Sequence, residues 1–186
     1  MAIFDFVEKK LDYKYYATDP YYPKRYYNDS DLSEAEVEFR RIVWEFKDGL
    51  NYDFIAEALS EGIDEITEIA NIDEWTLCCI PASTALKTQI KFKNFCDEFC
   101  KITHINNGFG YISNREDLKA QNLEWNSINL VAELNFSKKL NGRKVLLFDD
   151  IIARGETFLQ IAEHLKRIGV TEVVGMMIGK TTYKRT

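Results

Sequence analysis

The sequence predicts an α/β protein whose mostly parallel sheet is flanked by helices. Two short continuous apolar runs, at 76–80 and 144–148, are typical of strands that are buried on both faces. The second run is followed by a turn at 149–155, a helix with one apolar face and another apolar run at 170–178. This order of elements is a β-loop-α-β unit, which places its two strands parallel in one sheet. A chain of 186 residues is long enough for one such domain.

Residues 1–74 precede the α/β core that we expect over 75–186, and they indicate an extension or hood of a different character. Residues 13–27 hold seven of the ten tyrosines and two of the three prolines, which favours an extended arm over a helix. This arm either packs on its own domain or offers a surface to a partner or an aromatic ligand. Two amphipathic helices follow, and the first begins at a capping box formed by Ser33 and Glu36.

The charge is unevenly distributed along the chain. Residues 29–74 hold 15 acidic and 3 basic residues, so the rest of the chain is net positive although the formal net charge is −6. A basic half suits an anionic small substrate, and the overall charge argues against a nucleic-acid partner. No apolar run approaches the ~20 residues of a membrane span, and the start lacks the layout of a signal peptide. We therefore expect no membrane partner and a cytoplasmic location.

The four cysteines do not predict a disulfide framework, because nothing in the sequence indicates a secreted protein. Cys96, Cys100 and His104 follow one another at helical spacing, which leaves two interpretations. They are either three ligands of a metal ion, or Cys96 and Cys100 belong to a buried helix face and His104 belongs to the strand that follows. The second is favoured, since tetrahedral metal sites use more closely spaced pairs.

The chemistry is concentrated in a motif of 14 residues at 145–158, Val-Leu-Leu-Phe-Asp-Asp-Ile-Ile-Ala-Arg-Gly-Glu-Thr-Phe. Asp149 and Asp150 follow a buried strand, where ligands bind in open α/β sheets. Thr157 stands at the start of a helix, whose free N–H groups and dipole attract anions. Carboxylates that bind hydroxyl groups or a metal therefore lie one loop away from a phosphate site, and a sugar phosphate satisfies both. The alternative is an ordinary strand in which Asp150 caps a helix.

This motif resembles the phosphoribosyl pyrophosphate (PRPP) motif of the type I phosphoribosyltransferases. The resemblance implies that Asp149 and Asp150 bind the ribose hydroxyls and that the following loop wraps the 5′-phosphate. That loop consists of Ala153, Arg154, Gly155, Glu156 and Thr157. The family usually has small or hydroxylated residues where Ala153, Arg154 and Glu156 stand. Glu156 brings a carboxylate close to the phosphate, and Arg154 offers a compensating charge.

An earlier segment matches the position of the pyrophosphate loop in that family. It consists of Ala82, Ser83, Thr84 and Lys87. A helix is expected to follow over 84–100, and then a long polar loop over 106–127. Arg115 and Lys119 in that loop are further candidates for closing over the diphosphate. The strand that ends at Pro81, the basic stretch, the polar loop and the late motif also look like the ComF-like branch of the family.

The resemblance implies Mg²⁺-dependent PRPP binding and transfer of the phosphoribosyl group to a nitrogenous base or amine, with release of pyrophosphate. Mg²⁺ would be held by Asp149, Asp150 and the substrate, since this ion keeps several waters and takes few protein ligands. The alternative, favoured by Ala153 and Glu156, is a non-catalytic protein that responds to PRPP or a nucleotide. A DNA-uptake accessory protein is suggested by the branch alone. A homodimer is compatible with the sequence, and the acceptor is left open.

The acidic pair also carries an expectation about stability. Two adjacent like charges repel each other, so we expect the double variant Asp149→Asn/Asp150→Asn to fold as well as the natural chain. A pair that only caps a helix leads to the same expectation, because Asn is nearly as good an N-cap as Asp.

Overall fold

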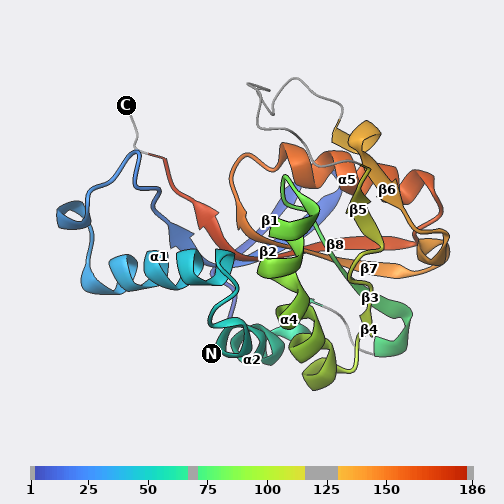
Figure 1. Cartoon of the computed structure of the whole chain (residues 1–186), viewed down its shortest axis with the longest axis horizontal. Coiled ribbons are helices and arrows are strands. Elements are labelled where there is room, and N and C mark those ends of the chain that lie inside the picture. Colours follow the sequence, from blue (N-terminus) through green and yellow to red (C-terminus); the bar gives the residue numbers. More distant parts are fainter. Residues whose placement is uncertain (1–2, 67–70, 116–129, 184–186) are drawn as a thin grey trace.

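A computed structural model describes residues 3–66, 71–115 and 130–183 of the chain. Its centre is a six-stranded sheet with the strand order β1-β2-β8-β7-β3-β4 (Figure 1). These strands are β1 (Phe6–Lys10), β2 (Tyr13–Tyr21), β3 (Trp75–Cys79), β4 (Asn106–Asn107), β7 (Lys144–Ile152) and β8 (Glu172–Thr181). Every neighbouring pair is parallel except β1 and β2, which are antiparallel. The predicted α/β fold with a mostly parallel sheet is therefore confirmed.

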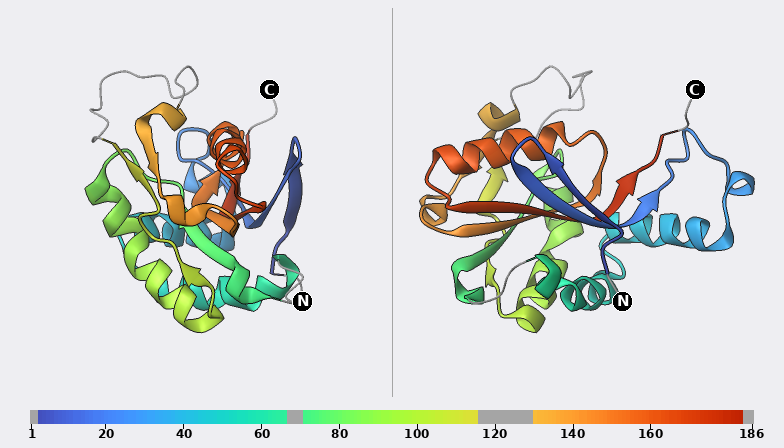
Figure 2. Two further views of the ribbon diagram at one scale, coloured as in Figure 1. Left: turned by 90° about the vertical axis from the view of Figure 1, so that its right-hand side faces the viewer. Right: turned by 180° about the vertical axis from the view of Figure 1, so that it is seen from behind.

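Helices cover both faces of this sheet (Figures 1 and 2). One face carries α5 (Glu156–Arg167), and the other carries α1 (Glu34–Lys47), α2 (Tyr52–Glu61), α3 (Ile63–Ile66) and α4 (Ala85–Thr103). Short 3-10 turns lie at Asp29–Asp31, Ile72–Glu74, Leu130–Glu133 and Lys138–Leu140, and β5 (Ile112–Asn114) pairs with β6 (Leu134–Phe136) in a small second sheet. Among the described residues, no helix is both long and apolar enough to cross a membrane.

The two faces of the sheet are set by the alternation of side chains along the strands. In β7, Leu146 and Phe148 pack with residues of α1, α2 and α4, whereas Val145 and Leu147 pack with residues of α5. All four side chains are fully buried. The continuous apolar run that predicted this strand thus serves two separate cores, one on each side of the sheet.

The tyrosine-rich arm is a strand of the same sheet. β2 runs parallel to β8, with Tyr15 opposite Gly175, and the side chains of Tyr15, Tyr16 and Tyr21 are buried. The predicted extended arm that packs on its own domain is therefore confirmed. Strands from both sides of residue 74 share one sheet, and the role of the first part of the chain as a hood stays a prediction.

Two elements extend beyond the boundaries that the sequence predicts. β7 continues through Asp149 and Asp150 to Ile152, where a turn was expected, because the backbone keeps pairing with β8 up to Ile152. α4 continues to Thr103. His104, expected in the next strand, instead ends α4 in the left-handed conformation with φ of 62°. The longer β7 matters for the site, since a strand points successive side chains to opposite faces.

Four phenylalanine side chains, Phe46, Phe92, Phe95 and Phe148, form an aromatic cluster that joins α1, α4 and β7. Phe148 stacks on Phe95 with ring centroids 4.2 Å apart. Phe46 meets the other three rings edge-on, at centroid distances between 5.6 and 6.2 Å. None of the four rings is exposed. The aromatic cluster therefore fixes how α1 and α4 lie on the carboxyl half of β7.

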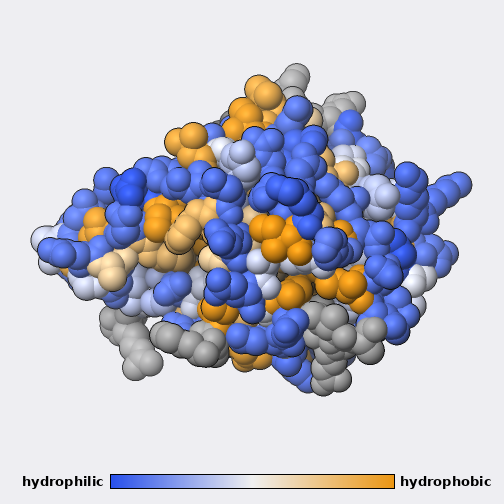
Figure 3. Space-filling view, turned by 90° about the horizontal axis from the view of Figure 1, so that it is seen from below, coloured by the Kyte–Doolittle hydropathy of each residue, from blue (hydrophilic) through white to orange (hydrophobic). Residues whose placement is uncertain are grey.

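The face of the molecule shown in Figure 3 carries apolar patches among polar residues. Leu50, Phe54 and Ile90 are large apolar side chains of the chain that stay about half exposed. A hollow of about 470 Å³ is lined by Phe54 together with Phe39 and Ile42. It is separate from the motif at 145–158, none of whose residues lines it.

We expect Phe148→Ala to lower the free energy of unfolding by about 3–5 kcal/mol, because it removes a fully buried ring from the aromatic cluster. Urea unfolding followed by circular dichroism measures this loss. Phe54→Ala is the control, since its side chain is 57% exposed, and it should change stability by no more than about 0.5 kcal/mol. Equal effects of the two substitutions would contradict the central place of the cluster.

Candidate functional site

A cleft of about 430 Å³ opens at the carboxyl end of β7. Asp149 and every residue of the range 151–158 line it, so the whole loop of the PRPP-like motif faces this one space. The remaining lining residues come from the start of the chain, from two neighbouring strands and from the end of the chain: Arg25, Tyr26, Ile80, Met177 and Tyr183. The motif singled out by the sequence thus forms a concave site, as a ligand-binding role requires.

The two aspartates of the motif point in different directions. Asp149 shares its side of β7 with Val145 and Leu147, and it lines the cleft toward α5. Asp150 is not among the residues that line the cleft, and its side chain is only 7% exposed. The resemblance implied that both carboxylates meet the ribose, but the structure brings Asp149 alone to the cleft.

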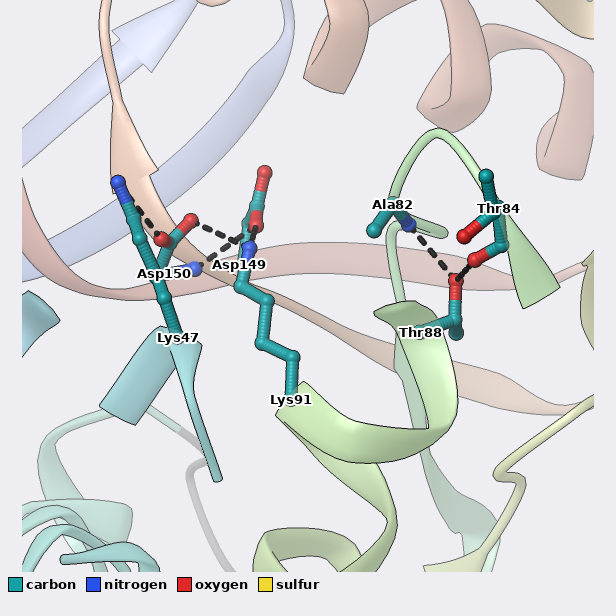
Figure 4. A network of polar contacts seen from close by, with 7 residues as sticks. All are labelled: Lys47, Ala82, Thr84, Thr88, Lys91, Asp149 and Asp150. Carbon is teal, nitrogen blue, oxygen red and sulfur yellow. Dashed lines mark hydrogen bonds and ion pairs between the residues drawn. The ribbon is translucent and has the colours of Figure 1, made fainter. Parts of the chain in front are cut away.

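Two lysines neutralise this acidic pair (Figure 4). Nζ of Lys91 lies 3.0 Å from Oδ1 of Asp149 and 2.7 Å from Oδ1 of Asp150, and it donates a hydrogen bond to each. Nζ of Lys47 lies 3.3 Å from Oδ2 of Asp150. Oδ2 of Asp150 makes this ion pair but accepts no hydrogen bond. Within the described ranges, Oδ2 of Asp149 has neither an ion pair nor a hydrogen bond with the protein. It is the oxygen that can accept a hydrogen bond from a ligand in the cleft.

Burial and the lysines give the two carboxyls opposite pKa shifts. Burial raises the pKa of Asp149 to about 7, and the neighbouring Asp150 adds to the rise although Lys91 opposes it. Burial also acts to raise the pKa of Asp150, but Lys91 and Lys47 outweigh it and hold that pKa at about 2. For Lys91, burial favours the neutral amine, yet the two carboxylates raise its pKa above the ordinary value. Asp150 and Lys91 are therefore a permanent ion pair, while Asp149 titrates near neutral pH.

The acidic pair does not fit a directly bound divalent cation. Mg²⁺ takes carboxylate oxygens as ligands, but three of the four oxygens of Asp149 and Asp150 already face an ammonium group of Lys91 or Lys47. Across residues 3–66, 71–115 and 130–183, no group of three or more His, Cys, Asp and Glu side chains could hold a metal ion. The Mg²⁺ expected from the resemblance stays a prediction without a protein cage.

Cys96 and Cys100 lie on the packed face of α4, as the sequence favoured. Cys96 is fully buried in α4, and its Sγ lies 3.2 Å from Sγ of Cys79 on β3. His104 lies at the exposed end of the helix. These positions provide no ligand set for a metal.

The phosphate end of the cleft is the start of α5. Gly155 is the N-cap residue in the left-handed conformation, with φ of +77°, and it has no side chain to cap the N–H groups of the first turn. Arg154 and Glu156 beside it are exposed. A Cβ atom at Gly155 would lie 3.7 Å from the side chain of Lys10. The β1–β2 hairpin therefore brings the aliphatic part of the Lys10 side chain to this helix start, which the sequence did not indicate.

The expected pyrophosphate loop uses several of its polar groups internally (Figure 4). The N–H of Ala82 donates to Oγ1 of Thr88 over 2.9 Å, so it is not free for a ligand. Oγ1 of Thr84 accepts from the N–H of Lys87 and caps α4. The side chain of Lys87 is exposed, and Ser83 is partly exposed. These two residues remain the candidates of this loop for contact with a diphosphate.

Of the two polar-loop candidates, Arg115 does not join the site. Residues 106–115 of the expected loop contain β4 and β5, and Lys119 lies outside the described residues. Nε of Arg115 donates to the carbonyl oxygen of Leu134, and Arg115 lines a different hollow of about 490 Å³ beside His164. Arg115 is not part of the lining of the cleft at Asp149.

The sequence did not indicate the two lysines, nor the aromatic wall that Tyr26 and Tyr183 form on the cleft. Tyr26 and Tyr183 line the cleft with ring centroids 6.0 Å apart, and the guanidinium of Arg25 lies over the ring of Tyr26 at 4.6 Å. One signal for Lys91 was present, because it falls within the buried stripe of α4. A lysine amid an apolar stripe indicates a paired charge. No local signal marked Lys47, whose partner is about 100 residues away.

Comparisons with known proteins show similarity in structure but not in sequence. No protein-family model matches it, and no curated protein matches it. Among solved structures, a hypoxanthine-guanine-xanthine phosphoribosyltransferase is similar, with 19% sequence identity and a TM-score of 0.37. That match covers 73% of this chain and 70% of the other. The function is therefore argued from the geometry of this chain's own cleft.

The contacts of Lys91 reverse the expectation about the asparagine variant. Asp149→Asn/Asp150→Asn leaves the ammonium of Lys91 buried without a counter-charge, and breaking a buried pair in this way costs about 3–5 kcal/mol. Adding Lys91→Met to the double variant removes the stranded charge and should recover more than half of that loss. Chemical denaturation of the natural chain, the double variant and the triple variant checks both steps. A double variant as stable as the natural chain would show that the ion pair is not structural.

Stability should also fall between about pH 4 and about pH 7 through Asp149. The folded state keeps the proton of this carboxyl up to a pKa of about 7, whereas the unfolded chain loses it near ~3.9. Between these two pKa values the folded state binds one proton more than the unfolded chain. The free energy of unfolding therefore falls as the pH rises through this window. Asp150 acts in the opposite sense but only below this window. The drop should be smaller in Asp149→Asn, and equal drops in urea unfolding at the two pH values would contradict the raised pKa.

Proposed function

We propose that this chain binds PRPP in the cleft and transfers its phosphoribosyl group to a nitrogenous base or amine, with release of pyrophosphate. One observation carries the proposal: a single cleft joins the open carboxylate oxygen of Asp149 to the uncapped start of α5. Those groups suit a ribose hydroxyl and a phosphate, respectively. A volume of about 430 Å³ lies within the range of small-molecule sites.

The residues of the cleft act by positioning and charge. Oδ2 of Asp149 accepts a hydrogen bond from a ribose hydroxyl, and the N–H groups after Gly155 bind the 5′-phosphate. An acceptor nitrogen then forms a bond to C1 of the ribose while the bond from C1 to the diphosphate oxygen breaks, and the acceptor loses its proton. Holding the ribose at both ends lowers the entropy cost of this step. Mg²⁺ would neutralise the leaving diphosphate when it is bound, and no step by these residues depends on it.

The acceptor site in this proposal is the aromatic wall. Tyr26 and Tyr183 are each a little under 40% exposed, so their rings are available on the side of the cleft. Planar bases stack on such rings with offset or tilted geometry. Both tyrosines lie outside the motif, and one of them belongs to the arm that precedes the core. We therefore expect the acceptor to be a base with an aromatic ring.

Calorimetry with PRPP and with ribose 5-phosphate tests binding, and pyrophosphate release with a panel of purine and pyrimidine bases tests transfer. Binding of both sugar phosphates together with release for one base supports the proposal. If neither sugar phosphate binds at millimolar concentration, the proposal is wrong.

A second candidate is a protein that binds PRPP or a nucleotide without transfer. It is favoured by the pyrophosphate loop, where the N–H of Ala82 donates to Oγ1 of Thr88 and Oγ1 of Thr84 accepts from the N–H of Lys87. Glu156 at the phosphate end favours it as well. Binding of PRPP without pyrophosphate release for any acceptor would select it. Membership of the ComF-like branch, a homodimer and a role in DNA uptake stay predictions.

Replacing Glu156 by Gln should raise the affinity for ribose 5-phosphate about two- to fivefold, because it removes a carboxylate from the helix start where the phosphate binds. The matched control is Glu163→Gln on the exposed side of the same helix, which should leave affinity unchanged. Isothermal titration calorimetry measures both. Unchanged or weaker binding by the Glu156 variant would place the phosphate elsewhere.

A further inference from the structure

The acidic pair carries its own cation. We propose that Lys91 takes the place of a protein-bound divalent metal at Asp149 and Asp150, so that the cleft binds the ribose phosphate without a divalent cation. This inference rests on the proposed sugar-phosphate site and goes beyond it, because the resemblance leads to the opposite expectation of a Mg²⁺-dependent site.

The position of Lys91 is that of a bridging cation. Its Nζ contacts one oxygen of each aspartate, at 3.0 Å and 2.7 Å, and its side chain is only 13% exposed. A metal ion shared by the two carboxylates would need those same oxygens. Lys91 faces them from α4, on the side of the sheet away from the open oxygen of Asp149. A ligand can therefore reach Asp149 from the cleft while Lys91 stays in place.

The charges of the site balance without a metal. Asp149 and Asp150 together carry up to two negative charges, and Lys91 and Lys47 supply two positive ones. An additional divalent cation would meet no uncompensated carboxylate and would be repelled by two ammonium groups. The ion pairs thus remove the attraction that a metal site at these residues needs.

Lys91 is also confined where it is. Its Nζ lies 4.4 Å from the centre of the Phe92 ring, and Phe92 and Phe95 of the same helix belong to the aromatic cluster. Swinging the ammonium away would leave Asp149 without a counter-charge and Asp150 with Lys47 alone, and breaking a buried ion pair in this way costs several kcal/mol. A ligand or metal that had to displace Lys91 would bind more weakly, because the cost of breaking these ion pairs is subtracted from its binding free energy.

The first test compares binding of ribose 5-phosphate and PRPP to the natural chain in excess EDTA and in millimolar MgCl₂. Ribose 5-phosphate is the cleaner probe, since it has no diphosphate to chelate the metal. We expect the dissociation constants in the two buffers to agree within about threefold. Binding of ribose 5-phosphate that is lost in EDTA would overturn the inference while leaving the proposed function standing. Absence of binding in both buffers would overturn the proposed function itself.

The second test asks whether the pair becomes a metal site once the lysine is gone. In Lys91→Met, we expect Mn²⁺ alone to raise the melting temperature in a saturable way, because Asp149 then has no counter-charge and Asp150 keeps only its ion pair with Lys47. The natural chain and the control Lys93→Met, which removes an exposed lysine of the same helix paired with Asp97, should show no such rise. Saturable stabilisation of the natural chain by Mn²⁺ would overturn the inference. If Lys91→Met does not fold, the comparison of the two buffers with the natural chain decides alone.

Discussion

The ion pair between Lys91 and two adjacent aspartates is the interaction on which the site depends. Taking an ammonium group and two carboxylates out of water costs several kcal/mol per ion, and only short, well-directed contacts offset this. The aromatic cluster supplies the necessary rigidity. Lys47, Lys91 and Asp149 are each direct sequence neighbours of a cluster phenylalanine, so the packing of the rings sets the distances between the charges.

The pleat of β7 points the two aspartates to opposite faces of the sheet, where they have different roles. Asp150 points to the side of the aromatic cluster, where both lysines hold it ionised and buried. Asp149 points to the cleft, shares Lys91 and keeps one oxygen open. One residue anchors the cation and the other presents its charge to a ligand. A turn at this position, as the sequence suggested, would not have enforced such a division.

The local parts of this design could be predicted from the sequence, and the long-range parts could not. The apolar run at 144–148, Gly155 and the helix after it predicted the β-loop-α unit, because strand burial and helix starts are local properties. The end of β7 was placed too early, since its pairing with β8 lies in another segment of the chain. Lys91 was not among the site residues that the sequence predicted. Its partners on β7 are about 58 residues away, and no local rule joins them.

A buried ion pair is weak evidence that a fold needs it for stability, because apolar residues of similar volume often serve as well or better. The strand before Asp149 is already apolar on both faces, and the aromatic cluster could have extended over the position of Asp150. The sheet instead keeps two acids where its strands end, next to a cleft and to an uncapped helix start. This placement fits a ligand that needs a charged oxygen at one end and N–H groups at the other. The lysines then have a clear physical role: they hold the carboxylates in the protein while the cleft is empty.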